Sequence, residues 1–281
     1  MLKKILLILF VVAACGFYLL FIRPAQLPRP ASSSYREISF KVGRIDYFLE
    51  DRSRVDPHQQ ALHEFRIVPV SFYYPVSCGE KKLPSPLPYS PQMIEKVKSV
   101  AEKHFRMPRI LLRPLDKLKT HSYKDAPLSR SDEQYPLIIF EHGLGSTPDF
   151  YTNLIEHLVA RGGFIVAAIS HAYASRNVIL PDGKILKSAL WWDGMRYPRK
   201  AVMREIEQQL WMEDVLFLLD QLFTKKLQSP VITAIDVERI GIIGHSFGGS
   251  TAAQLCRLDN RIKAGVNMDG GLNGPDFLEP F

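Results

Sequence analysis

Apolar and polar positions alternate between strand-like and helix-like patterns through the second half of the chain. Four short runs have the apolar composition of buried strands: 136–140, 164–169, 240–243 and Ile262–Met268. Two intervening stretches have helical spacing: 149–161 and 200–223. In the first of these helices, Leu154, Leu158 and Val159 are expected to face inward. Strands that alternate with helices predict a doubly wound, mostly parallel α/β sheet.

The first half of the chain has a less regular pattern. A strand-like alternation over 62–74 ends at Pro75. Residues 77–135 are rich in Pro and Lys, and we interpret them as an insertion between early strands that carries one helix at 91–104. Within 81–124, eleven Lys or Arg residues stand against three Asp or Glu, a net charge of +8. A solvated surface is the simpler interpretation of this charge, and a lid or face that meets anionic lipid is the alternative.

An apolar run of eighteen positions, 5–22, lies close to the start of the chain. Its length is at the threshold for a membrane span, and it exceeds the apolar core of a cleaved signal peptide. We therefore predict that residues 1–22 are a membrane anchor or signal segment, and we favour an uncleaved transmembrane helix. The Pro- and Ser-rich stretch 23–35 is expected to be a linker.

Residues 12–15 also resemble a bacterial lipobox, in which Cys15 would be lipidated, although the apolar run continues beyond it. Both interpretations export the remainder of the chain. We expect a domain at 36–281 on the periplasmic or extracellular side, anchored in the membrane by the N-terminal helix. The alternative is a secreted protein or a lipoprotein held through Cys15.

Overall composition limits the classes of partner and cofactor. The chain has 36 Lys and Arg against 29 Asp and Glu, a net charge of +7, and no nucleic-acid-binding motif, so no nucleic-acid partner is expected. No Cys and His residues have the spacing of a zinc site, and we expect neither a metal nor a cofactor. Cys78 and Cys256 are interpreted as free thiols, with a bridge between them as the alternative.

The segment 244–248 carries the clearest chemical signal. Its sequence, Gly-His-Ser-Phe-Gly, matches the nucleophile elbow Gly-x-Ser-x-Gly, with a strand-like run before it and a small-residue helix after it. A strand–turn–helix with Ser246 at its apex exposes the serine hydroxyl at the top of a sheet, as an α/β-hydrolase requires. The competing interpretation is a glycine-rich turn with an inert serine.

Three other positions complete a candidate acyl-transfer site around Ser246. The backbone N–H of Phe247, the residue after the nucleophile, is one expected oxyanion donor. The second is expected from Leu144, in the loop that follows strand 136–140. Asp269, at the carboxyl end of the strand Ile262–Met268, is the preferred acid, and Asp276 is its rival.

Three blocks together resemble the plasma-type platelet-activating factor acetylhydrolases, which are group VII-like phospholipases A2 with an α/β-hydrolase fold. The blocks are PLIIFEHGLG at 136–145, GFIVAA at 163–168 and IGHSFGG at 243–249, and the resemblance spans 62–272. It implies Ca-independent hydrolysis of short or oxidised sn-2 acyl esters of phospholipids through an acyl-enzyme. It also implies Ser246 as nucleophile, Asp269 as acid, and the Leu144 and Phe247 amides as the oxyanion hole.

Two other functions remain open at this point. One is a broader carboxylesterase, a polyester hydrolase or a dienelactone-type hydrolase on the same fold, which would use the same site. The other is a catalytically inactive α/β-hydrolase-fold protein that serves in binding. A 1-alkyl-2-acetylglycerophosphocholine esterase-like hydrolase is the favoured prediction, with a lipid ester as substrate and a membrane as partner.

The base of the triad is the piece that the sequence does not supply. None of the eight histidines follows Ser246, whereas the family places its catalytic histidine after the acid. We therefore expect this histidine, the last strands and the closing helix to lie beyond Phe281, leaving the domain incomplete, with an open sheet edge at Ile262–Met268, and the chain as given inactive.

Upstream histidines are weaker candidates for the base. His142, His171 and His245 each match a position that is not the base in the family, and His171 is expected to line or support the site. The remaining histidines are predicted to lie on the surface: His58, His63, His104, His121 and His157.

Overall fold

The computed structural model describes residues 40–58, 63–76, 83–130, 132–175, 177–188 and 199–272. The chain divides into two compact units, Met1–Glu37 and Ile38–Phe281, and the second contains all of these residues. The predicted anchor, the linker, Cys15, Cys78 and Asp276 lie outside the described residues. Within the described residues, no helix has the length and apolar character needed to cross a membrane.

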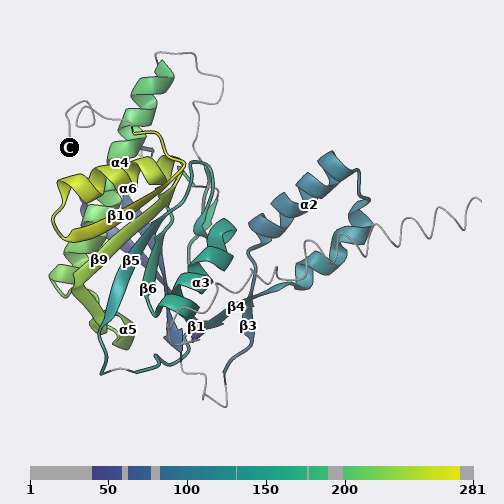
Figure 1. Cartoon of the computed structure of the whole chain (residues 1–281). Helices are drawn as coiled ribbons and strands as arrows, with labels where there is room; N and C mark the ends of the chain where they lie inside the picture. The colour runs from purple at the N-terminus through teal and green to yellow at the C-terminus, as the bar shows by residue number, and fades with distance from the viewer. Residues whose placement is uncertain are drawn as a thin grey trace, which may run out of the picture. The chain divides into compact units, whose positions relative to one another are not determined.

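An eight-stranded sheet forms the centre of the second unit (Figure 1). Its strands run in the order β10 (Ile262–Met268), β9 (Ile235–His245), β5 (Tyr135–Glu141), β6 (Ile165–Ile169), β2 (Phe65–Val76), β1 (Lys41–Val55), β4 (Lys119–Lys124) and β3 (Pro86–Pro88). The first four are parallel, and β2 runs antiparallel to both of its neighbours. The predicted mostly parallel α/β sheet is therefore confirmed. Two short strands, β7 (Val178–Ile179) and β8 (Ile185–Leu186), pair separately.

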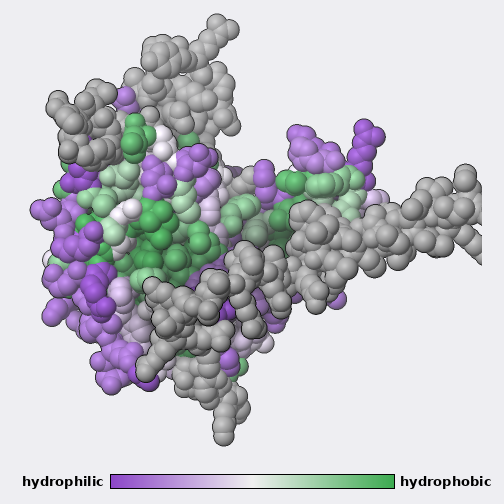
Figure 2. Space-filling view, in the orientation of Figure 1, coloured by the Kyte–Doolittle hydropathy of each residue, from purple (hydrophilic) through white to green (hydrophobic). Residues whose placement is uncertain are grey.

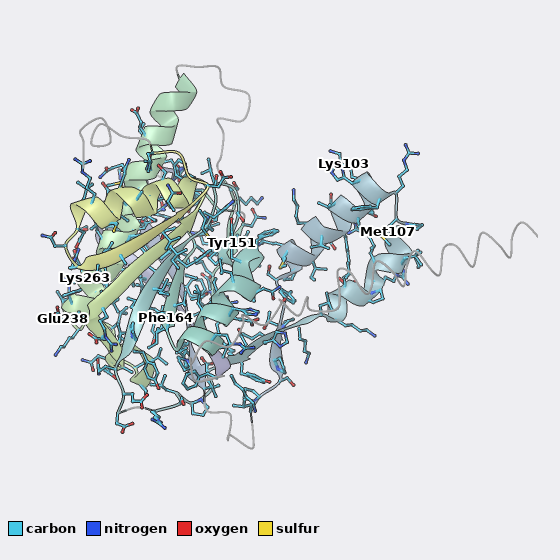
Figure 3. All side chains as sticks on the ribbon, viewed as in Figure 1. Lys103, Met107, Tyr151, Phe164, Glu238 and Lys263 are labelled. Carbon is cyan, nitrogen blue, oxygen red and sulfur yellow. The ribbon has the colours of Figure 1, made fainter. Side chains whose placement is uncertain are left out.

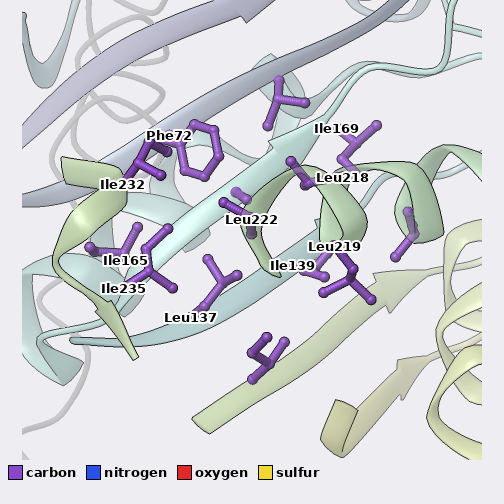
Figure 4. Packing of buried hydrophobic residues seen from close by; sticks show 14 of the residues in the cluster. Phe72, Leu137, Ile139, Ile165, Ile169, Leu218, Leu219, Leu222, Ile232 and Ile235 are labelled. Atoms are coloured by element: carbon purple, nitrogen blue, oxygen red, sulfur yellow. The ribbon is translucent and has the colours of Figure 1, made fainter. Parts of the chain in front are cut away.

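The helices are distributed along the chain as α2 (Pro91–Phe105), α3 (Thr152–Gly162), α4 (Arg199–Phe223), α5 (Pro230–Thr233) and α6 (Phe247–Leu258), with 3₁₀ helices η3 (Arg109–Lys117) and η4 (Pro148–Tyr151). The two faces of the sheet bury different sets of side chains. Ile138 and Phe140 of β5 pack with Ile155 and Val159 of α3. The alternate side chains of β5 belong to a larger cluster with α4 and α6. Figure 4 shows part of this cluster, where strand residues meet Leu218 and Leu219 of α4.

Strands covered on both faces need apolar side chains at successive positions, not only at alternate ones. All five residues of β6 are buried, and so are six of the seven in β5. This continuous burial is the reason why 136–140 and 164–169 appear as unbroken apolar runs in the sequence. The carboxyl ends of these strands meet at one edge of the sheet, where catalytic groups gather in parallel α/β folds.

Several sequence predictions need correction. In α3, Val159 is buried and Leu158 packs against the same cluster as predicted, but Leu154 is 38% exposed and Ile155 is buried in its place. The helix begins after a 3₁₀ turn, and its buried positions Thr152, Ile155 and Val159 follow helical spacing from that start. The long strand β1 was not predicted, although alternation is present in its sequence. The segment 77–135 also contributes β3 and β4 to the main sheet, in addition to the predicted α2.

Among the described strands, β10 lies at the edge of the sheet, next to β9. Its residues are more exposed than those of the central strands, and Val266 is 49% exposed. The pairing with β9 aligns Met268 with His245, so the carboxyl end of β10 lies beside the residue that precedes Ser246. The position of β10 therefore brings the predicted acid to the predicted nucleophile.

Candidate active site

Ser246 occupies the strained turn that a nucleophile elbow requires. Its backbone has φ 53° and ψ −117°, between the end of β9 and the start of α6, and the residue is exposed. A Cβ on Gly244 would lie 2.0 Å from the carbonyl oxygen of Gly248, and one on Gly248 would lie 2.4 Å from that of His142. Both glycines of the motif are therefore required because the backbone segments lie too close together for a Cβ. The elbow packs directly against the end of β5.

The loop after β5 leaves one backbone amide available beside Ser246. The Gly143 N–H donates to the Tyr151 hydroxyl at 3.2 Å, and the Gly145 N–H donates to the Ala174 carbonyl at 3.2 Å. Among the described residues, the Leu144 N–H between them has no hydrogen-bond partner. A Cβ on Gly143 would lie 3.6 Å from the Ser246 Cβ, so this loop borders the nucleophile.

The peptide between Gly143 and Leu144 is held in one orientation through its carbonyl. The Gly143 oxygen accepts from His142 Nδ1 at 2.8 Å and from the Ser146 N–H at 3.0 Å. The C=O and N–H of a trans peptide point in opposite directions, so these bonds direct the Leu144 N–H away from His142. The Ser175 hydroxyl donates to the other ring nitrogen of His142 at 2.8 Å, which fixes the tautomer.

The second predicted donor is the N–H of Phe247, the first residue of α6. The first amides of a helix have no carbonyl in a preceding turn to bond, and they carry the positive end of the helix dipole. Phe247 is buried, with its ring 4.9 Å from that of Trp211 in an edge contact. Leu144 packs against the same small cluster, so both candidate donors border one apolar patch.

Asp269 directly follows β10, at the carboxyl end of the strand beside β9. The Ser246 N–H donates to the carbonyl of Met268 at 2.8 Å, which ties the nucleophile to the residue before Asp269. Asp269 is exposed and has φ 59°, a strained conformation for a residue other than glycine. The structure therefore brings Ser246, Leu144, Phe247 and Asp269 to the same edge of the sheet.

No described histidine hydrogen-bonds the Ser246 hydroxyl. His142 and His171 are fully buried, and both ring nitrogens of each are engaged by other groups. His245 bonds the Tyr151 hydroxyl through Nδ1 at 2.8 Å. Burial, with the neighbouring His171, lowers the pKa of His142 to about 3, which keeps this imidazole neutral.

A buried ionic network lies at the end of β5, next to the loop that follows this strand. His171 Nε2 is 2.7 Å from Glu141 Oε2, and its Nδ1 is 2.9 Å from Asp214 Oδ2. Arg66 binds Asp214 through two nitrogens, at 3.0 and 2.6 Å. Burial alone would lower the pKa of His171, but the two carboxylates outweigh it and raise that pKa. Burial would likewise raise the pKa of Asp214, but Arg66 and His171 hold it below its usual range.

The network continues to His58, which corrects its predicted surface location. Its side chain is 7% exposed, 3.2 Å from Asp56 and 3.5 Å from Glu207. Burial opposes a charge on His58, yet hydrogen bonds to these carboxylates raise its pKa to about 9. Trp211 donates to Glu207 at 2.9 Å and stacks on His171 with ring centroids 3.9 Å apart. The same indole therefore contacts both the network and Phe247.

Sequence reasoning missed most of this network and also Tyr151. A charged residue inside an apolar strand, as at Arg66 in β2, is the one local signal that could have indicated a buried ion pair. Its partner Asp214 lies 148 positions later in α4, and Tyr151 has no motif. Among the described residues, no group of three or more His, Cys, Asp or Glu side chains could hold a metal ion. Cys256 is a free thiol.

Comparison with known proteins gives the family of the chain. Residues 58–180 and 201–273 match the family described as platelet-activating factor acetylhydrolase, isoform II. The chain belongs to this family.

Two relatives with the name platelet-activating factor acetylhydrolase show the extent of the likeness. The protein of Bos taurus is 31% identical over 160 residues, and that of Cavia porcellus is 29% identical over 164. These matches cover 50% and 52% of this chain, but only 36% and 37% of the relatives. The chain thus spans little more than a third of their length.

A solved structure, the ferulic acid esterase of Streptomyces cinnamoneus, gives the fold. It is 27% identical with a TM-score of 0.60, over 85% of this chain and 61% of that one. The chain therefore has the fold of an α/β-hydrolase esterase.

The close approach at Gly244 yields a prediction about stability. Gly244→Ala should lower the free energy of unfolding by about 1–3 kcal/mol or more, because its methyl group would overlap the Gly248 carbonyl. Gly241→Ala on the same strand is the matched control, since its Cβ would meet Ala264 at an ordinary 3.5 Å and should change stability by less than about 0.5 kcal/mol. Urea unfolding measures both variants. Equal stabilities would contradict the crowded elbow.

Proposed function

We propose that this protein is a serine esterase that removes short or oxidised sn-2 acyl groups from phospholipids through an acyl-enzyme. The observation that carries the proposal is the juxtaposition of Ser246, on a strained elbow, with the Leu144 and Phe247 amides. Family membership supports the lipid ester as substrate. A broader carboxylesterase is the second candidate, favoured by the structural likeness to a ferulic acid esterase.

In the proposed reaction, Ser246 Oγ attacks the ester carbonyl carbon and the carbonyl oxygen becomes an oxyanion. The Leu144 and Phe247 N–H groups stabilise this charge, and removal of one such donor typically costs about 10²–10³ in rate. The C–O bond to the glycerol oxygen then breaks, and the lysophospholipid leaves with the proton that serine released. Water hydrolyses the acyl-serine ester and regenerates the hydroxyl.

A base must take the serine proton, because a serine hydroxyl is a weak nucleophile at neutral pH. We assign Asp269 to orient a histidine that performs this step, in the order serine, acid, histidine. The buried histidines His142 and His171 are not assigned this role, since both nitrogens of each are already bonded. Apart from this base, no other chemical group is required for the acyl transfer.

Labelling with a fluorophosphonate tests the nucleophile directly. The full-length protein should form a covalent adduct at Ser246, because phosphonylation uses the same serine, oxyanion donors and base as acylation. Ser246→Ala should abolish labelling, whereas Ser250→Ala, in the first turns of α6, should retain it. Peptide mass spectrometry locates the adduct. Undiminished labelling of Ser246→Ala would remove Ser246 from the mechanism.

The α2–η3 segment, defined as residues 91–119, supports a membrane as partner of the esterase. Its exposed large apolar side chains are Val97, Val100, Phe105, Ile110, Leu111 and Leu118. All three of its carboxylates are paired within the segment, with Lys98 or Arg109. The six other basic residues are exposed: Lys96, Lys103, Arg106, Arg113, Lys117 and Lys119.

Exposed apolar side chains next to unbalanced positive charge favour contact with anionic lipid. They therefore favour the second of the two interpretations of this basic segment over a simple solvated surface. Figure 2 shows hydrophobic and hydrophilic residues side by side on this part of the surface, and Figure 3 labels Lys103 and Met107 where α2 gives way to η3. We propose that α2–η3 docks on the lipid surface that holds the substrate. Anchoring through 5–22, with the esterase domain exported, is part of the same proposal.

Vesicle binding by a protein without residues 5–22 distinguishes lipid contact through α2–η3 from anchoring through that apolar run. Residues 38–281 should co-sediment with phosphatidylcholine vesicles containing phosphatidylglycerol more strongly than with phosphatidylcholine alone. Ile110→Ser should weaken this binding about tenfold, because burial of an Ile side chain contributes about 1.5–3 kcal/mol. Ile179→Ser, at an isoleucine of similar exposure in β7, is the matched control and should bind as the wild type does. Equal binding of both variants would contradict the docking surface.

A further inference from the structure

Tyr151 joins three elements at the candidate active site. Its hydroxyl accepts the Gly143 N–H at 3.2 Å and bonds His245 Nδ1 at 2.8 Å. Gly143 belongs to the loop after β5, and His245 is the last residue of β9, directly before Ser246. Tyr151 itself lies where η4 gives way to α3 (Figure 3). Its ring packs on Phe140 with centroids 5.0 Å apart, which holds the hydroxyl in place.

The loop after β5 and the elbow at Ser246 are both bonded to the Tyr151 hydroxyl, through Gly143 and His245. A Cβ on Gly143 would lie 3.1 Å from His245 Nδ1, 3.2 Å from the Tyr151 hydroxyl and 3.6 Å from the Ser246 Cβ. No side chain therefore separates the loop from Ser246, and a single polar group can bond to both sides. The Tyr151 hydroxyl is such a group, because it is bonded to one residue on each side.

We propose that Tyr151 is a positioning residue for the oxyanion hole. Its hydroxyl ties the Gly143 amide to His245 and so fixes the distance between the Leu144 N–H and Ser246. This inference rests on the proposed esterase function, in which the two donors must lie about 2.7–3.1 Å from the oxyanion. A displacement of about 1 Å in such a site can reduce the rate about 10²-fold.

The same hydroxyl also decides which amide is left for the substrate. Since Gly143 N–H is bonded to Tyr151 and Gly145 N–H to Ala174, the loop offers the Leu144 N–H. Without the hydroxyl, the Gly143 N–H loses its hydrogen-bond partner within the protein. The loop can then rearrange, because the hydrogen bond from Gly143 to Tyr151 no longer helps to hold the Leu144 peptide in its orientation.

Tyr151→Phe tests the inference because it removes only the hydroxyl and keeps the ring on Phe140. We expect the second-order rate constant for fluorophosphonate labelling of Ser246 to fall about tenfold to hundredfold. We also expect hydrogen exchange of the Gly143 amide to accelerate at least about tenfold, while the Gly145 amide, bonded to Ala174, exchanges as in the wild type. Tyr74→Phe is the matched control, since it removes a buried hydroxyl that bonds the Ala126 carbonyl in the core.

Two outcomes overturn the inference. One is an unchanged Gly143 exchange rate in Tyr151→Phe, and the other is faster exchange with the labelling rate of the wild type. The first of these outcomes, combined with a fall in melting temperature, shows a purely structural tyrosine. If the full-length wild type is not labelled at all, the proposed function fails, and faster Gly143 exchange in Tyr151→Phe would still establish the link from loop to elbow.

Discussion

The contact between the end of β5 and the nucleophile elbow is the constraint on which the site depends. The backbone of Gly248 lies so close to His142 that a Cβ there would approach its carbonyl oxygen to 2.4 Å. A second close approach, at Gly143, brings the same loop to the Cβ of Ser246. Parallel pairing of β5 with β9 sets these two strand ends side by side. Neither approach leaves room for a side chain, so the loop that carries Leu144 lies directly beside Ser246.

Buried charged side chains lie next to this contact between β5 and the elbow. Glu141 ends β5 and is fully buried, so its carboxylate needs a partner within the protein. His171 is that partner. It also pairs with Asp214, whose charge Arg66 neutralises. A buried network of this kind contributes little to stability compared with apolar packing, but loss of one member leaves a charge unpaired. The network therefore ties the last residue of β5 to α4 and β2 through charged side chains.

The parts of the site that could be predicted from the sequence are those that depend on a local motif or on a position directly after a buried strand. Ser246 and Phe247 follow from the elbow motif, and Leu144 and Asp269 follow from their positions after buried strands. Parallel pairing then brings strand ends together whatever the intervening sequence. The long strand β1 was not predicted, because no motif marks its sequence.

The network and Tyr151 could not be predicted because they depend on residues far apart in the chain. Arg66 and Asp214 are 148 positions apart, and Tyr151 and His245 are 94 positions apart. His58 was placed on the surface because an isolated histidine gives no sign of its partners, Asp56 and Glu207. A single sequence reveals which residues end strands, whereas side-chain pairing across the fold is visible only once the strands are packed.

A crystal structure of the protein after reaction with a phosphonofluoridate tests the central claim most directly. A phosphonylated serine mimics the tetrahedral intermediate of acyl transfer, with its phosphoryl oxygen in the place of the oxyanion. The expected result is a bond from phosphorus to Ser246 Oγ, with the phosphoryl oxygen about 2.7–3.1 Å from the Leu144 and Phe247 nitrogens. An adduct on another residue, or a phosphoryl oxygen turned away from both amides, would contradict it.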